Sequence, residues 1–174
     1  TLPPSQVGPV PVLPFLLAPQ AAIANGTTGV TTIPGVPGPA TGSLTVAPGT
    51  TKFTMPGTWN DSWRNSYTGP IFFSSATTAT LTLPARTTAF HVFISPNTFG
   101  TFTVVATTNS GTTSGTITIN DNNPTTVPRL GFYTTTAGET IQTIRLVTND
   151  ANGMAMALFG LAQAPAAPTI SSAT

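Results

Sequence analysis

The chain has 174 residues, which is enough for one domain with a hydrophobic core. Its net charge is +1, and only 5% of its residues are charged, against about 25% in an ordinary soluble domain. The charges are scattered singly, so the sequence offers no basic patch to nucleic acid or to an anionic membrane surface. It contains no cysteine, which excludes disulfides, thiolate metal sites and a cysteine nucleophile.

Residues 1–41 are predicted to form a proline-rich N-terminal arm. The first 51 residues carry no charge, and more than half of the 18 prolines fall before residue 50. A flexible linker is one interpretation, but the arm is too apolar for a solvated linker. We expect it to dock in a hydrophobic groove of this subunit or of a neighbouring one. The residues predicted to dock are Val10, Val12, Leu13, Phe15, Leu16 and Leu17.

The apolar run from Val10 to Ala18 is too short to cross a bilayer and is interrupted by prolines, so no membrane insertion is expected. Because Thr1 rather than a methionine opens the sequence, we expect that an upstream segment has been removed.

Residues 42–163 are predicted to form one β-sandwich domain. Short segments with β propensity are separated by turn-forming clusters, and several alternate apolar residues with threonine. No convincing helix of three turns is present. We therefore predict an all-β, jelly-roll-like sandwich of about eight to ten strands, followed by an Ala/Pro/Ser tail over residues 164–174. The expected strands are 43–47, 52–55, 71–75, 80–83, 89–94, 101–107, 116–120, 130–134, 140–148 and 154–162.

The sequence provides few candidates for catalysis. His91 is the only histidine, and it has no carboxylate close to it in the sequence, so a structural or surface role is expected. Glycoside hydrolysis needs two carboxylates facing each other across a cleft, and the spacing pairs none of them. We therefore predict no enzymatic activity and no catalytic residue. The carboxylates are Asp61, Asp121, Glu139 and Asp150.

Two oxygen-rich loops, residues 120–123 and 149–153, have the composition of calcium-binding loops. Each contains only one carboxylate, whereas a good calcium site gathers six to eight oxygens, so turns between strands are the preferred interpretation. We expect no metal site and no cofactor. Asn25 and Asn60 match the acceptor pattern for N-glycosylation, which arises often by chance in a threonine-rich chain.

The segment GTWNDSWRNSYTGP, residues 57–70, contains both tryptophans and one of the two tyrosines. One interpretation is an aromatic platform for sugar rings, built from Trp59, Trp63 and Tyr67 with Asn60 as a polar partner. The other is a loop that closes one end of the sandwich, with the indoles buried in the core. The second interpretation is preferred because an exposed tryptophan is costly.

Residues 57–162 resemble exported bacterial β-sandwich domains of the kind found in extracellular proteins with a PEP-CTERM sorting tail. The phrases SPNTFGTFTV and GFYTTTAGETIQTI carry the resemblance, which does not extend to the N-terminal arm. It implies secretion to the extracellular space or cell surface and a jelly-roll-like fold, and it assigns no catalytic residue. The PEP-type tail itself is absent from this sequence.

Two function classes follow. The first is a non-enzymatic extracellular structural subunit whose copies assemble into a filament, sheath or surface layer through the N-terminal arm. Its uncharged hydroxyl and amide surface would let a like copy approach at little electrostatic cost. The alternative is a carbohydrate-binding or adhesive module that contacts an extracellular polysaccharide through Trp59, Trp63 and Tyr67. A viral coat protein would also use an N-terminal arm for assembly, but this arm lacks the basic residues that would package RNA.

Overall fold

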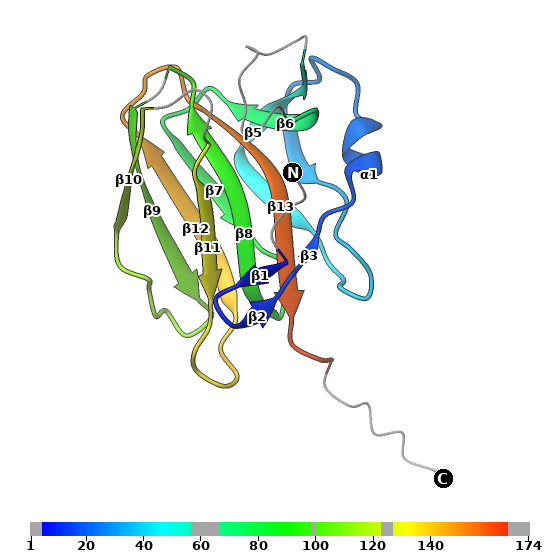
Figure 1. Ribbon diagram of the computed structural model, residues 1–174, viewed down its shortest axis with the longest axis vertical. Coiled ribbons are helices and arrows are strands. Elements are labelled where there is room, and N and C mark those ends of the chain that lie inside the picture. The colour runs from blue at the N-terminus through cyan, green and yellow to red at the C-terminus, as the bar shows by residue number, and fades with distance from the viewer. Residues whose placement is uncertain (1–4, 57–66, 99, 123–126, 167–174) are drawn as a thin grey trace.

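The computed structural model describes residues 5–56, 67–98, 100–122 and 127–166. Within these residues the regular secondary structure is almost entirely β, so the predicted all-β class is confirmed (Figure 1). The helix found there, α1 (Leu17–Ala21), has five residues, and no helix in these ranges is long and apolar enough to span a membrane.

The N-terminal part of the chain forms four short strands around α1. They are β1 (Gln6–Val7), β2 (Val10–Pro11), β3 (Leu13–Pro14) and β4 (Val30–Ile33). The longer strands follow: β5 (Leu44–Met55), β6 (Gly69–Ser74), β7 (Thr78–Thr82), β8 (Thr87–Pro96), β9 (Gly100–Thr108), β10 (Ile117–Asp121), β11 (Arg129–Tyr133), β12 (Ile141–Thr148) and β13 (Met154–Gln163).

The long strands form one antiparallel sheet that curls so that its two halves face each other, as in a sandwich (Figure 1). One half has the order β10-β9-β12-β7-β5, and the other continues as β5-β6-β13-β8-β11. Strand β4 pairs with β5, and β3 pairs with β13. The sheet therefore contains two strands from the segment that the sequence assigned to the arm.

Strand β5 belongs to both halves. Its residues 45–47 pair with β7, and its residues 51–55 pair with β6. The sequence predicted two separate strands here because Pro48 and Gly49 are typical of a turn. The prediction of a break was wrong: β4 pairs alongside β5 on both sides of this dipeptide, with partners Val30↔Thr50 and Thr32↔Thr45.

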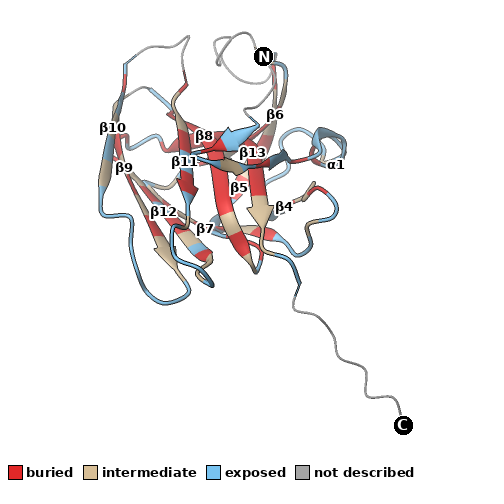
Figure 2. Cartoon of the chain, turned by 60° about the horizontal axis from the view of Figure 1, so that its bottom comes forward, coloured by how far each residue is buried: buried red, intermediate tan, exposed pale blue. Residues whose placement is uncertain are grey.

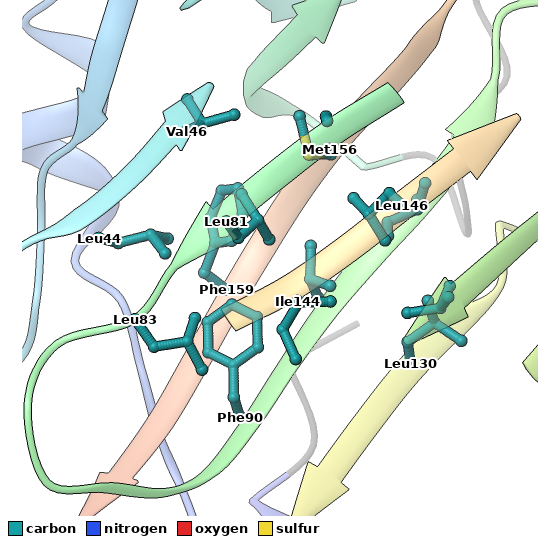
Figure 3. Close-up of a cluster of buried hydrophobic side chains, with 14 of the residues drawn as sticks. Leu44, Val46, Leu81, Leu83, Phe90, Leu130, Ile144, Leu146, Met156 and Phe159 are labelled. Atoms are coloured by element: carbon teal, nitrogen blue, oxygen red, sulfur yellow. The ribbon is translucent and has the colours of Figure 1, made fainter. Parts of the chain in front are cut away.

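The core lies between the two halves. Leu81, Ile144 and Leu146 from one half meet Phe90, Met156 and Phe159 from the other (Figure 3). The alternation seen in the sequence explains this arrangement, because every second side chain of a strand points to the same face. Burial is concentrated on the facing strands, whereas the connecting loops are largely exposed (Figure 2).

Candidate functional site: the N-terminal arm

The arm packs against the body of its own chain. In β3, Leu13 pairs with Leu161 and Pro14 pairs with Gly160 of β13. The amide of Phe15 then donates a hydrogen bond of 2.9 Å to the carbonyl oxygen of Phe159. Main-chain bonds of this kind continue the sheet beyond β6, which pairs with β13 only over residues 154–156.

The predicted docking residues divide into two groups. Val12 and Phe15 are buried in their own chain, Phe15 with its ring centroid 5.8 Å from that of Phe159. Leu13, Leu16 and Leu17 point the other way and are exposed by 46%, 54% and 40%. Val10 is half-buried, packing against a small cluster of Val7, Val12 and Ala89. The arm is thus anchored by one group and presents the other to solvent.

A shallow hollow of about 570 Å³ lies beside the exposed Leu13. Its walls are mainly apolar and include Pro11, Pro39 and Leu161. Arg86 also lines the hollow, and its Nη1 donates a hydrogen bond of 2.7 Å to the carbonyl oxygen of Ala164. The apolar surface of the arm therefore continues into a concave surface formed by β13 and the segment before β5.

Of the residues predicted to bind glycans, the structure describes only Tyr67. Trp59, Asn60 and Trp63 lie outside the described residues, and so does the glycosylation pattern at Asn60. Tyr67 is half-buried against the cluster of Met55, Ile71 and Phe93, and its hydroxyl donates to the carbonyl oxygen of Pro70 at 2.9 Å. Burial raises the pKa of the Tyr67 phenol. Its ring therefore packs against this cluster.

Asn25, the other candidate for glycosylation, lies on an exposed loop. Its Oδ1 accepts hydrogen bonds from Lys52 Nζ at 2.8 Å and from Thr54 Oγ1 at 2.6 Å. Burial of the Lys52 side chain lowers the pKa of its amine. The amide oxygen of Asn25 therefore ties this loop to β5.

Of the two oxygen-rich segments, residues 149–153 form a turn in the structure, whereas Asn120 and Asp121 end strand β10 and residue 123 lies outside the described residues. Asp150 accepts hydrogen bonds from the Thr98 amide at 2.6 Å, from Thr98 Oγ1 at 2.8 Å and from the Asn152 amide at 2.8 Å. Burial raises the pKa of Asp150, but these hydrogen bonds outweigh that effect and keep the pKa below its usual value. Asp121 Oδ2 accepts a hydrogen bond from Ser95 Oγ at 2.9 Å. Among the described residues, no three His, Cys, Asp or Glu side chains are grouped as a metal site would require.

His91 is fully buried on β8. It lies on the outer face of the sheet, because Phe90 and Val92 on either side of it point into the main core. Within the described part of the chain, neither imidazole nitrogen has a hydrogen-bond partner. The pKa of His91 is lowered to about 4, first by burial and then by the positive charge of Arg129, against a smaller raising effect from the Leu158 main chain.

Sequence reasoning missed a hydroxyl-rich region at the end of the sandwich where β9–β10 and β11–β12 are connected. Glu139 Oε1 accepts hydrogen bonds from the hydroxyl groups of Ser110 and Thr112, the second at 3.0 Å. These bonds lower the pKa of Glu139, so the carboxylate stays ionised. Two adjoining hollows of about 360 and 170 Å³ share Thr134, Thr135 and Glu139 in their walls. The only signal in the sequence was the run of threonines at 134–136 before the Ala-Gly turn.

The comparisons with known proteins assign no family to this arrangement. No model of a known protein family matches the chain, and no curated protein sequence matches it.

Proposed function

We propose that the protein is a non-enzymatic structural subunit that associates with copies of itself through the N-terminal arm. The observation that carries the proposal is the division of the arm into anchoring and exposed residues. Val12 and Phe15 fix the arm on its own chain, while Leu13, Leu16 and Leu17 remain in water. Exposed apolar residues on a fixed support are typical of a surface that contacts another protein.

The electrostatics of the chain favour contact between identical copies. The first 51 residues carry no charge, so two arms can meet without repulsion and without burying an unpaired ion. The apolar hollow beside Leu13 offers a concave partner for a projecting leucine. When the two contacting surfaces of a subunit differ, the contact generates a ring or an open filament, which is the kind of assembly proposed here.

The extracellular location is part of the proposal and depends on the resemblance of residues 57–162 to exported bacterial domains. We also infer that the fold is a jelly roll. The layers β6-β13-β8-β11 and β7-β12-β9-β10 place consecutive strands in opposite layers, except for the β9–β10 hairpin, as two interleaved Greek keys do. Jelly rolls occur in both capsid and lectin domains, so the proposed function depends on the arm and not on the fold.

The test uses the full chain, because removal of residues 1–41 would also remove Phe15 and β4 from the fold. The test variant is Leu16→Ser with Leu17→Ser, and the control is Tyr133→Ser, which changes another exposed large side chain. Light scattering after size exclusion and negative-stain microscopy at neutral pH would measure assembly. We expect oligomers or filaments from the wild type and the control, and monomers from the double variant. A monomeric wild type, or a double variant that assembles like the wild type, would contradict the proposal.

Saccharide binding is the second candidate, and the region around Glu139 is the observation that favours it. Hydroxyl groups and one ionised carboxylate are groups that hydrogen-bond sugar hydroxyls, and the hollows there have no cationic side chain among their lining residues. Affinity electrophoresis in gels containing cellulose, chitin or β-glucan derivatives would test this function. Retardation of the wild type but not of Glu139→Ala supports it, and equal mobility in every gel excludes these three polysaccharides.

A further inference from the structure

The outer face of β8, β11 and β13 is covered by the chain's own N-terminal hairpin, which consists of β1, β2 and the turn between them (Figure 1). Val7 and Val12 are buried there against Ala89 of β8. His91 lies on the same face of β8 as Ala89, two residues further along the strand. The hairpin therefore covers a face that contains a buried imidazole.

Glycines provide the space for both the imidazole and the hairpin. The cross-strand partners of His91 are Gly131 on β11 and Gly160 on β13. A Cβ atom at Gly160 would lie 2.2 Å from His91 Nε2, and one at Gly131 would lie 2.9 Å from Val7 Cγ1. The imidazole thus fills the place of one missing side chain, and Val7 of the hairpin fills the place of the other.

This buried face favours a neutral imidazole. Neither ring nitrogen makes a hydrogen bond of normal geometry to the described residues, so a proton added to the ring would be a buried charge that the Leu158 main chain compensates only in part. In the described parts of β8, β11, β13 and the hairpin, Arg129 is the charged side chain, and Tyr133 on β11 is the other titratable group besides His91. Arg129 is itself bonded to the hairpin, because its Nη2 donates to the carbonyl oxygen of Gln6. A protonated His91 would repel the residue that holds the hairpin.

We propose that protonation of His91 releases the hairpin from this face, and that the freed face accepts the hairpin of a second copy. The inference rests on the proposed function for its partner, a second copy of this chain. The structure supports that choice because the face already binds one hairpin of this sequence, and the same contacts are available to another. Exchange of an identical element between copies is a low-cost route to association.

The hairpin is suited to leave without unfolding the body. It is joined to the anchored residue Phe15 by Val12 and by Leu13 and Pro14 of β3, and the pairing of β1 with β2 is internal to the hairpin. Its contacts with the body include the cluster of Val7, Val12 and Ala89, the ring of Tyr133 beside Gly8, and the hydrogen bond from Arg129. Regions with few buried contacts open more readily than the core does.

The chain allows a direct test of protonation because it contains one histidine. The nuclear magnetic resonance titration of the imidazole C2 proton reports His91 alone, and we expect a midpoint well below 6.5. Release of the hairpin can be followed in Val12→Cys, the only thiol in an otherwise cysteine-free chain. Its rate of labelling by dithiodipyridine is divided by the rate in urea at the same pH. At pH values above the midpoint, the protonated fraction of His91 rises about tenfold for each unit by which the pH falls. The labelling rate, relative to the rate in urea, should therefore also rise about tenfold for each unit.

Two variants separate this mechanism from general acid unfolding. His91→Phe in the Val12→Cys background removes the titrating group, and its thiol should stay protected at the pH at which the parent is labelled. Arg129→Gln removes the repelling charge, so the midpoint of His91 should move to higher pH even if His91→Phe does not fold. Identical labelling of Val12→Cys with and without His91→Phe, or an ordinary midpoint near 6.5 with a protected thiol, would overturn the proposal.

Exchange is tested by a brief acid pulse followed by return to neutral pH. Wild-type chain should then elute from size exclusion as a larger species than before the pulse, and His91→Phe should remain in its starting state. A wild type that opens in acid but returns only as the starting species would rule out exchange. If the wild type is monomeric at neutral pH, or the leucine double variant assembles as the wild type does, the proposed function fails, whereas the titration and the labelling still decide the release of the hairpin.

Discussion

His91 on β8 and Gly160 on β13 are cross-strand partners, and a Cβ atom at Gly160 would come within 2.2 Å of the imidazole Nε2. The pair sits next to an irregularity between Ala157 and Gly160, where Leu158 has a φ of 54°. The bulge and the missing side chain together make room for a ring inside a closely packed face.

Gly160→Ala should therefore destabilise the protein. The new methyl group must displace the imidazole or the strand, and overpacking of this kind costs about 1–3 kcal/mol. Urea unfolding would measure the loss in free energy of unfolding. Gly38→Ala is the matched control, because a Cβ atom there meets nothing within 4 Å. Equal stability of the two variants would show that the contact in the structure is not made in solution.

The free energy of unfolding should fall as the pH drops from about 6.5 towards 4. The pKa of His91 is about 4 in the folded chain and about 6.5 in the unfolded chain, so between these values the unfolded state binds more protons. The stabilisation is fully present above 6.5, and the full loss for this difference is about 3 kcal/mol. Urea unfolding of the wild type and His91→Phe at pH 7, 5.5 and 4.5 would measure it. The two pH profiles should diverge, and parallel profiles would mean that another group is responsible.

Phe15→Ala and Leu16→Ala should differ sharply although the residues are adjacent. Phe15 belongs to the main core, so its truncation should cost about 3–5 kcal/mol. Leu16 is 54% exposed, and its truncation should change stability by less than about 0.5 kcal/mol. Chemical denaturation of the two variants provides the comparison. A small effect of Phe15→Ala would indicate that the arm is not part of the fold.

Asp150→Ala should destabilise the loop that joins β12 to β13. The carboxylate accepts two hydrogen bonds from Thr98 and one from the Asn152 amide, and loss of one such buried acceptor costs about 1–3 kcal/mol. Thermal unfolding would measure the effect. Added calcium should leave the melting temperature of the wild type unchanged, because the carboxylate is already occupied by these donors. A calcium-dependent rise that Asp150→Ala abolishes would contradict the assignment as a turn.

The β class was predictable because alternation is a local property of the sequence. Leu81 and Leu83 alternate with threonines, and the structure buries both leucines in the core. The extent of β5 was not predictable in the same way. Pro48 and Gly49 favour a turn locally, and only the pairing with β4 keeps the strand continuous.

The candidate sites were harder to predict because they depend on contacts between distant segments. The sequence identifies Val12 and Leu13 as apolar neighbours, but only the docking on β13 decides which is buried and which is exposed. His91 gave no signal of its environment, since its glycine partners lie 40 and 69 residues further along the chain. The hydroxyl groups around Glu139 likewise come from two loops that the topology brings together.

Strand β5 has a consequence for how the protein unfolds. Its first part is hydrogen-bonded to β7 and its last part to β6, so the two halves of the sheet share one uninterrupted backbone segment. Separation of the halves would break the hydrogen bonds of β5 to β6 and to β7 together. The body of the sandwich should therefore lose its structure in a single cooperative transition, without a state in which one half survives alone.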